Sequence, residues 1–219
     1  MSPHSKGAPL SICPLQRAAE NAKPKYHHGD LRQTLVETAY DLVRENGAEH
    51  FSLADACRRA GVSTAAPYKH FRDRNEVLEL VTQRAFLELT DASMEAVKTA
   101  GGPQTLAGMQ ALFASYITFA MGNQALFRLM FGQHPELKKA EPVLGCGQSC
   151  FEQVVTHVAT YCAATGITED SKLVTVRAWT FVHGLACLLM DEDYEAVAPD
   201  LDHQALLRDT LPRLLHAKP

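Results

Sequence analysis

Apolar residues recur at intervals of three and four positions along almost the whole chain after residue 30, and this spacing constrains the fold most strongly. In an α-helix it places them on one face, whereas a half-buried strand alternates apolar and polar residues. Leu31, Leu35, Ala39 and Leu42 begin the pattern, and Gly47 follows as a helix stop. No segment shows a convincing strand pattern, so we expect an all-α protein.

Further helical patterns fill the rest of the chain. A long helix is expected to begin at Asp73, with apolar positions that include Leu78, Val81 and Leu89. Other helices are expected over residues 109–121, 124–131, 147–163, 170–190 and 202–215. The pattern within 170–190 is apolar nearly all round, which indicates burial on several sides. No apolar run reaches the roughly 18 residues needed to cross a bilayer, so we expect a cytoplasmic protein that does not contact a membrane.

Residues 52–71 have the pattern of two short helices joined by a turn that contains glycine. Ser52 precedes an apolar run and Asp55 follows it by three residues, as in a helix-capping box, while Gly61 closes the segment. Ser63 is a cap candidate for the next helix, expected over residues 64–71. This plan is typical of a helix-turn-helix, whose second helix lies in the DNA major groove.

The residue types of the second short helix suit contact with a duplex. Small residues at its start allow close approach to base edges, and the Thr64 hydroxyl or methyl suits a base. Polar side chains further along can bond phosphates, which set most of the affinity and the register. Pro67 disfavours a regular helix at Ala66, so a 3₁₀-like or bent start is an alternative that changes the base register. The candidate DNA contacts are Lys25, Ser52, Ser63, Thr64, Ala65, Ala66, Tyr68, Lys69, His70, Arg72 and Arg74.

Four of these candidates have a simpler structural explanation. Ser52 and Ser63 are equally suited to be helix caps only. Tyr68 and His70 can pack in part against the first helix, and Phe71 is expected in the core.

The run from Leu31 to Leu80 resembles the N-terminal domain of TetR-family regulators. The resemblance rests on Phe51-Ser52-Leu53, Ala60-Gly61-Val62-Ser63 and Tyr68-Lys69-His70-Phe71. It implies that Thr64, Ala65 and Ala66 face the bases, that Tyr68, Lys69, His70 and Arg74 meet the backbone, and that Ser52 touches a phosphate. The run 126–132, together with Trp179 and His183-Gly184, is similar to the subgroup with a C-terminal Trp-His-Gly signature.

These observations divide the chain into three parts. Residues 1–25 lack apolar periodicity and are expected to form a disordered arm that either lies along DNA or has no role. Residues 26–74 form the expected helix-turn-helix domain, and residues 75–219 a helical domain for ligand binding and dimerisation. Residues 1–74 carry 11 Lys and Arg against 8 Asp and Glu, although the chain has a net charge of −4. This basic N-terminal third suits local attraction to a polyanion.

The C-terminal part is expected to supply a pocket and a dimer interface. A two-fold operator requires a homodimer, for which residues 170–190 and 202–215 can form a four-helix bundle with the partner, although a helix buried within a monomer has the same pattern. Pockets between helices are mostly apolar, and apolar residues that could line such a pocket can also be ordinary core residues. His183 is either a polar group of the pocket or a packing residue beside a closely approached Gly184. The candidate ligand contacts are Phe113, Tyr116, Phe127, Met130, Phe151, Trp179 and His183.

We therefore expect a sequence-specific transcriptional regulator, a repressor that a small-molecule effector releases from a palindromic double-stranded operator. An activator or a ligand-independent regulator is the alternative, and a helical interaction protein or an enzyme is a distant one. No catalytic fingerprint occurs, so no catalytic residue or cofactor is expected. Cys146 and Cys150 have poor spacing for a zinc site, so we expect no metal and reduced thiols.

Overall fold

The computed structural model describes residues 31–132 and 134–216, and within these ranges every regular element is a helix. The all-α prediction is therefore confirmed. The elements in chain order are α2 (Leu31–Asn46), α3 (Leu53–Arg59), the 3₁₀-helix η1 (Pro67–Lys69), α4 (Arg74–Thr99), α5 (Leu106–Gly122), α6 (Gln124–Phe131), α7 (Pro135–Lys139), α8 (Glu141–Thr165), α9 (Ser171–Met190), α10 (Asp193–Val197) and α11 (His203–Leu215).

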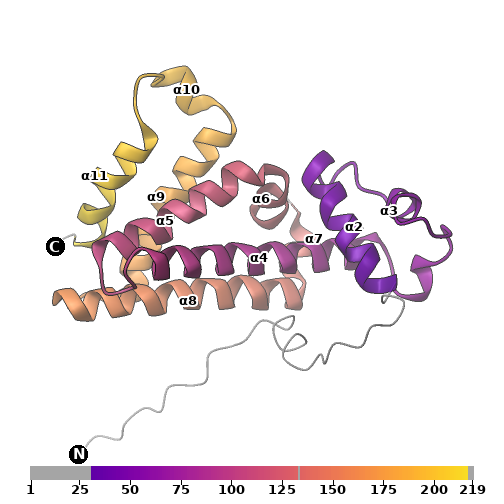
Figure 1. Ribbon diagram of the computed structural model, residues 1–219, viewed down its shortest axis with the longest axis horizontal. Helices are drawn as coiled ribbons and strands as arrows, with labels where there is room; N and C mark the ends of the chain where they lie inside the picture. Colours follow the sequence, from indigo (N-terminus) through magenta and orange to yellow (C-terminus); the bar gives the residue numbers. More distant parts are fainter. Residues whose placement is uncertain (1–30, 133, 217–219) are drawn as a thin grey trace, which may run out of the picture.

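The helices form a small N-terminal group and a larger C-terminal group, joined by α4. In Figure 1, α2, α3 and the beginning of α4 gather at one end of the molecule, and α4 runs from there through the rest. Along its length α4 packs against α2, α5, α6 and α8. The division at residue 74 stays an interpretation, since α4 begins there and contributes to both groups.

One continuous hydrophobic core fills both groups. Leu35, Val77 and Phe71 are buried at the N-terminal end, and Leu126 and Phe127 of α6 are buried further along. Because α6 packs on α2 and on α4, it connects the small group to the large one. A displacement of α6 or α4 would therefore be felt by α2.

The predicted bounds agree with the structure for α6 and nearly so for α9, α11 and the start of α4, and α2 and α3 lie where they were expected. Helices α5 and α8 begin earlier than predicted. Helix α8 begins at Glu141, six residues before the predicted start at 147, because Pro142 occupies its first turn, where a missing N–H is harmless. The two short helices α7 and α10 were not predicted, since five residues are too few to show a periodicity.

Helix α9 is long and apolar enough, by length and composition alone, to cross a membrane. Lys172 and Arg177 lie within this helix, so it contains no uninterrupted apolar run of about 18 residues. In the structure α9 packs against α5, α8, α10 and α11. Its residues Val174, Ala178 and Val182 are fully buried there.

Candidate DNA interface and ligand cavity

Ser52 begins α3 as a helix cap. Its Oγ accepts a hydrogen bond from the Asp55 backbone N–H at 3.1 Å and donates to the Asp55 carboxylate at 2.6 Å. This hydroxyl bond is the main reason that the pKa of Asp55 lies below its ordinary value, and Arg58 beside it acts in the same direction. The predicted capping role of Ser52 is thus present, and its phosphate contact stays a prediction.

Gly61 reverses the chain after α3. Its φ of 71° lies in the left-handed region, which costs a glycine nothing. The Val62 N–H then donates to the Cys57 carbonyl at 2.9 Å, which satisfies an acceptor at the end of α3. The turn required by a helix-turn-helix is therefore built at the predicted residue.

The third short helix was predicted over residues 64–71 as a regular helix, and that prediction is wrong. Residues 64–66 form a turn, in which the Ala66 N–H donates to the Ser63 carbonyl at 2.9 Å, and only Pro67–Lys69 follow as a 3₁₀-helix. Pro67 has no N–H to donate, and its own carbonyl accepts from His70 at 2.8 Å and from Phe71 at 2.9 Å. The 3₁₀-like alternative raised by Pro67 is the one that the structure adopts.

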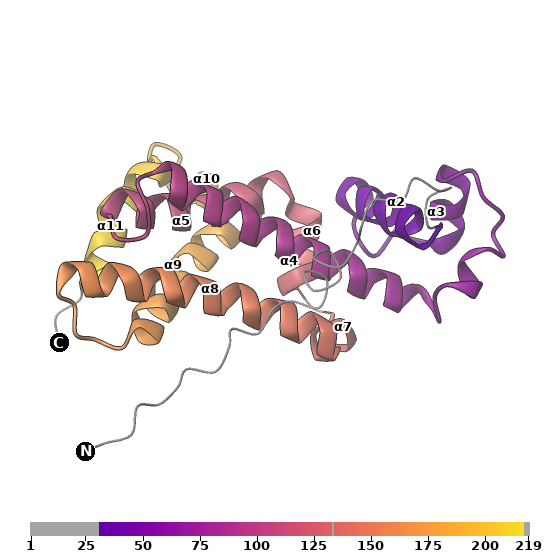
Figure 2. The same ribbon diagram turned by 60° about the horizontal axis from the view of Figure 1, so that its bottom comes forward.

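Residues 63–70, called here the recognition segment, present most of their side chains to solvent. Tyr68 is 68 % exposed, which is unusual for an aromatic residue of a small domain. Ser63, Thr64, Ala65, Lys69 and His70 are also exposed, whereas Ala66 is half-buried. Phe71, which follows the segment, is buried as predicted. The segment lies at the end of the molecule farthest from α11 (Figure 2).

The basic residues near the recognition segment differ in how free they are. Arg72 is highly exposed, although its Nε lies 3.2 Å from a Glu76 carboxylate oxygen. Arg74 is directed inward, because its Nε donates to the Phe51 carbonyl at 2.9 Å and its Nη2 to the Ala48 carbonyl. The Arg74 guanidinium is thus bonded to the loop before α3. Its expected phosphate contact stays a prediction. Lys25 lies outside the described residues.

Polar contacts join the N-terminal group to α4. The Tyr40 hydroxyl donates to the Glu88 carboxylate, and burial together with this bond raises the pKa of Tyr40 far above its ordinary range. The Arg84 guanidinium lies over the Tyr40 ring, 4.1 Å from its centre, and donates to Glu88 at 3.1 Å. Glu88 is two residues from Phe86, which lines the cavity described next.

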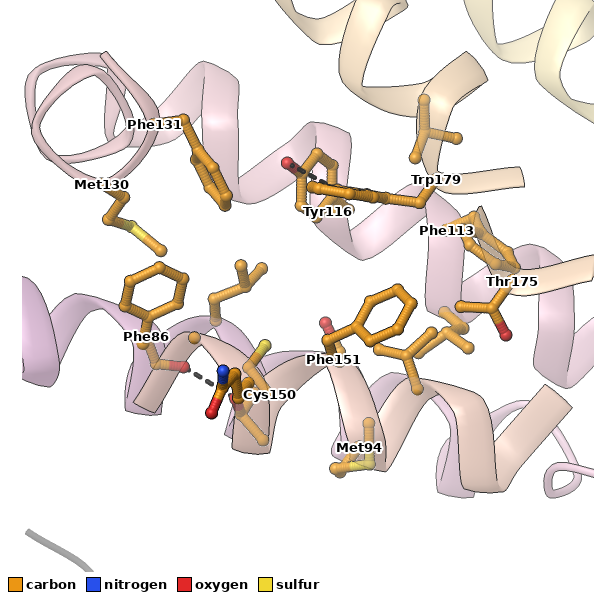
Figure 3. Close-up of a pocket in the computed structure, with 18 of the residues that line it drawn as sticks. Phe86, Met94, Phe113, Tyr116, Met130, Phe131, Cys150, Phe151, Thr175 and Trp179 are labelled. Atoms are coloured by element: carbon orange, nitrogen blue, oxygen red, sulfur yellow. Dashed lines mark hydrogen bonds between the residues drawn. The ribbon is translucent and has the colours of Figure 1, made fainter. Parts of the chain in front are cut away.

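A cavity of about 440 Å³ lies between α4, α5, α6, α7, α8 and α9. Figure 3 shows aromatic and aliphatic side chains that point into it from helices far apart in the sequence. Most of its wall is carbon, so it has the apolar character of a small-molecule site. The lining residues named in Figure 3 are Phe86, Met94, Phe113, Tyr116, Met130, Phe131, Cys150, Phe151, Thr175 and Trp179.

Three aromatic residues form a hydrogen-bonded group on one wall of this cavity. The Trp179 Nε1–H donates to the Tyr116 hydroxyl oxygen at 3.2 Å, and the same hydroxyl lies 2.7 Å from His183 Nδ1. Burial lowers the pKa of His183, and the positive charge of Lys138 acts in the same direction, so the ring is neutral at pH 7. The hydroxyl thus accepts from Trp179 and shares a second hydrogen bond with Nδ1, whose donor is set by the imidazole tautomer. We refer to Trp179, Tyr116 and His183 as the aromatic triad.

Five of the seven predicted ligand contacts line the cavity, namely Phe113, Tyr116, Met130, Phe151 and Trp179. Phe127 and His183 do not line it. They pack behind Tyr116 with their rings stacked, 5.5 Å between centres and 30° between planes. The contribution of α4 was not predicted, because Phe86, Leu89 and Thr90 follow the same spacing as ordinary core residues.

Two further expectations can be compared with the structure. Cys57, Cys150, Cys162 and Cys187 are free thiols, as expected for these four. Cys146 is disulfide-bonded, so the expectation of a reduced thiol is wrong for this residue. Gly184 is exposed, and a Cβ placed on it would meet nothing within 4 Å. The expected close approach of another helix to Gly184 is therefore absent within the described part of one chain.

Two family models match the chain. A model described as "Bacterial regulatory proteins, tetR family" matches residues 35–81, and one described as "Tetracyclin repressor-like, C-terminal domain" matches residues 109–214. The first match contains the recognition segment, and the second contains most of the cavity. Together they span most of the chain.

Individual proteins agree with these matches. A solved structure of a protein of unknown function from Rhodococcus sp. RHA1 is 30 % identical, with a TM-score of 0.73, over 89 % of this chain and 98 % of that chain. The regulator FadR from Bacillus subtilis, solved with stearoyl-CoA, has the same fold with a TM-score of 0.63, at 13 % identity over 85 % of this chain and 99 % of that chain. The HTH-type transcriptional regulator BetI of Klebsiella pneumoniae is 34 % identical over 61 residues, which are 28 % of this chain and only 31 % of that protein.

Proposed function

Because the chain belongs to the TetR family of bacterial regulatory proteins, we propose that it is a transcriptional regulator that binds operator DNA as a dimer and responds to a small molecule. The observation that carries this proposal is the exposed recognition segment at one end of a fold whose other end encloses an apolar cavity. The family models and the named regulators give no support to the alternative of an enzyme.

The recognition segment supports DNA binding through its chemistry. Thr64 and Ala65 are small and exposed at its start, where backbone and bases can approach closely. Tyr68 and Lys69 are exposed further along and suit phosphate oxygens. Because Arg74 is bonded to the loop before α3, we propose that it fixes the position of α4 and that Lys69 supplies the main positive charge.

The cavity supports a response to a ligand because it borders the helices that reach the DNA-binding end. Phe86 belongs to α4, and Met130 and Phe131 to α6, and both helices pack on α2. A molecule that enters the cavity can displace these helices and so change the spacing of two recognition segments in a dimer. Repression relieved by the ligand is the sign we propose, and linkage requires ligand and operator to weaken each other's binding by the same factor.

An exposed apolar face of α9 supports dimerisation. Leu173, Val176 and Leu188 are 54 %, 39 % and 47 % exposed, and Gly184 opens space between them for a second helix. The predicted contribution of α11 has less support, since its leucines are used within the chain. The buried residues of α11 are Leu207, Leu211 and Leu215.

We also propose that the chain belongs to the subgroup with the Trp-His-Gly signature. Trp179 and His183 meet in the aromatic triad, and Gly184 lies on the exposed face of α9. The signature would then serve the cavity wall and the dimer face at once.

The test of DNA recognition is selection of bound fragments from sheared DNA of the source genome. We expect a small set of enriched fragments that share a two-fold repeat, with half-sites about one helical turn apart. Recovery of all fragments in proportion to their length would contradict sequence-specific regulation.

The test of the dimer face is sedimentation of V176E beside V197E. Val176 lies on the exposed face of α9, whereas Val197 ends α10 and is 83 % exposed. We expect V176E to sediment as a monomer with weakened operator binding, because it places a charge in the interface. V197E should remain a dimer, and an unchanged V176E dimer would exclude this face.

A further inference from the structure

We propose that the cavity takes a neutral, predominantly aromatic molecule, which its walls recognise by shape and ring stacking rather than by charge. This inference rests on the proposed function only in treating the cavity as the ligand site. It is supported by the charges, the hydrogen bonds and the rings of the cavity wall.

The cavity wall offers no counter-charge deep inside. Among the described residues that line it there is no Asp or Glu, and the one charged residue is Lys138. Lys138 is exposed at the rim, and its Nζ donates to the Phe131 carbonyl at 2.8 Å. A buried cation would lack any carboxylate, and an anion would meet a positive charge only at the rim. Both would lose hydration without compensation, which is costly.

The hydroxyl groups of the wall are already bonded to the protein, whereas the Gln148 side chain, which also lines the cavity, is exposed to solvent. The Thr90 hydroxyl donates to the Phe86 carbonyl, and the Thr175 hydroxyl donates to the Ser171 carbonyl, each at 2.7 Å. Ser115 Oγ lies 2.9 Å from Ser93 Oγ.

The remaining polar wall groups are neutral. Burial raises the pKa of the Cys150 thiol, so the thiol is uncharged. The Tyr116 hydroxyl is held between its two partners in the aromatic triad. Away from the exposed, uncharged Gln148 amide, a strongly polar ligand would therefore have to break existing bonds to make its own.

Aromatic rings surround the space from several directions. They come from five helices, so that flat ring systems can be stacked or met edge-on at several points. A volume of about 440 Å³ is near the lower end for small-molecule sites, which favours a compact ligand over a long chain. The rings belong to Phe86, Phe113, Tyr116, Phe131, Phe151 and Trp179.

The single tryptophan of the chain provides the assay. Trp179 lines the cavity, so energy transfer from its emission reports an occupant directly. The two probes are N-phenyl-1-naphthylamine, which is neutral, and 8-anilinonaphthalene-1-sulfonate, which has the same rings and one added sulfonate. We expect saturable binding of the neutral probe, about tenfold or more tighter than that of the sulfonate, because the sulfonate would lose its hydration in the cavity.

A matched pair of variants places the binding site. A Cβ at Gly147 would lie 3.4 Å from the Phe86 ring, whereas one at Gly145, on the same helix, would meet nothing within 4 Å. We expect G147M to fill the cavity and weaken the neutral probe by about tenfold, a loss of 1.4 kcal/mol. G145M should bind like the wild type, and thermal unfolding shows whether both variants are folded.

The outcomes separate this inference from the proposed function. If the sulfonate binds as tightly as the neutral probe, or if neither probe binds a protein that still selects operator DNA, the neutral aromatic class is wrong and the regulator stands. Equal binding by G147M and G145M would place the probe elsewhere and overturn the assignment to this cavity. Loss of DNA selection is a separate result that contradicts the proposed function alone.

Discussion

Tyr116→Phe removes the one hydroxyl that holds the aromatic triad together. In the wild type this oxygen accepts from Trp179 at 3.2 Å and lies 2.7 Å from His183 Nδ1. The substitution leaves the indole N–H and the imidazole nitrogen without these partners, while the shape of the ring is unchanged. Any change in stability therefore reports the hydrogen bonds.

The magnitude follows from the burial of the two groups left behind. A buried polar group that loses its partner costs about 1–3 kcal/mol, whereas an accessible one recovers a bond to water. Tyr116 is only 9 % exposed, so water reaches this place poorly. Because His183 is partly accessible, we expect a total loss of about 2–3 kcal/mol in the free energy of unfolding.

Urea unfolding followed by circular dichroism measures this loss, since Trp179 emission would itself be altered by the substitution. Tyr161→Phe is the matched control, because the Tyr161 hydroxyl has one histidine partner, His216 Nε2 at 2.7 Å, and His216 is exposed. The control should lose only about 0.5–1 kcal/mol. A Y116F protein no less stable than Y161F would refute the reasoning, because the triad would then contribute nothing.

Three further predictions concern stability. Ser52→Ala should lower the free energy of unfolding by about 1 kcal/mol, because it removes the α3 cap. Urea titration measures this loss, with Ser52→Thr as the control that keeps the hydroxyl. Equal losses in both variants would exclude the cap. Gly61→Ala should cost about 1 kcal/mol because φ is 71° there, and an unchanged melting temperature would count against this turn. The pKa of His183 is lowered in the folded state, so its contribution to stability is full above its unfolded pKa of about 6.5 and is lost as the pH falls through that value toward the folded pKa. His183→Asn should flatten the pH dependence of unfolding between about pH 7 and 5, and parallel curves would show that His183 does not titrate as described.

The helices of the C-terminal group could be predicted because long apolar patterns depend little on tertiary context. Helix α6 was predicted at its observed bounds, since its buried residues Leu126, Phe127, Leu129 and Met130 recur at helical spacing. Helix α7 and helix α10 were out of reach, because their five residues are held by contacts that local spacing does not encode.

In the candidate sites too, features set by local sequence could be predicted, and features set by distant residues could not. Exposure of Tyr68 and capping by Ser52 follow from local chemistry and were foreseen. The inward bonds of Arg74 and the place of Phe86 in the cavity depend on residues far away in the sequence. A charged or aromatic residue at a helix surface carries no local signal of such a partner.

The salt dependence of duplex binding, compared between K69A and K98A, tests whether the segment from Ser63 to His70 recognises DNA. Lys69 is exposed in the recognition segment, whereas Lys98 is exposed near the far end of α4. Each substitution by alanine removes one positive charge. Each neutralised phosphate adds about 0.9 to the slope of log K against log salt, so two copies of Lys69 in a dimer contribute about 1.8.

Fluorescence anisotropy with a selected genomic fragment measures these slopes between low and physiological salt. We expect the affinity to fall as salt rises, K69A to bind more weakly with a shallower slope, and K98A to follow the wild type. Binding that does not change with salt, or equal slopes for K69A and K98A, would contradict DNA recognition by the segment from Ser63 to His70.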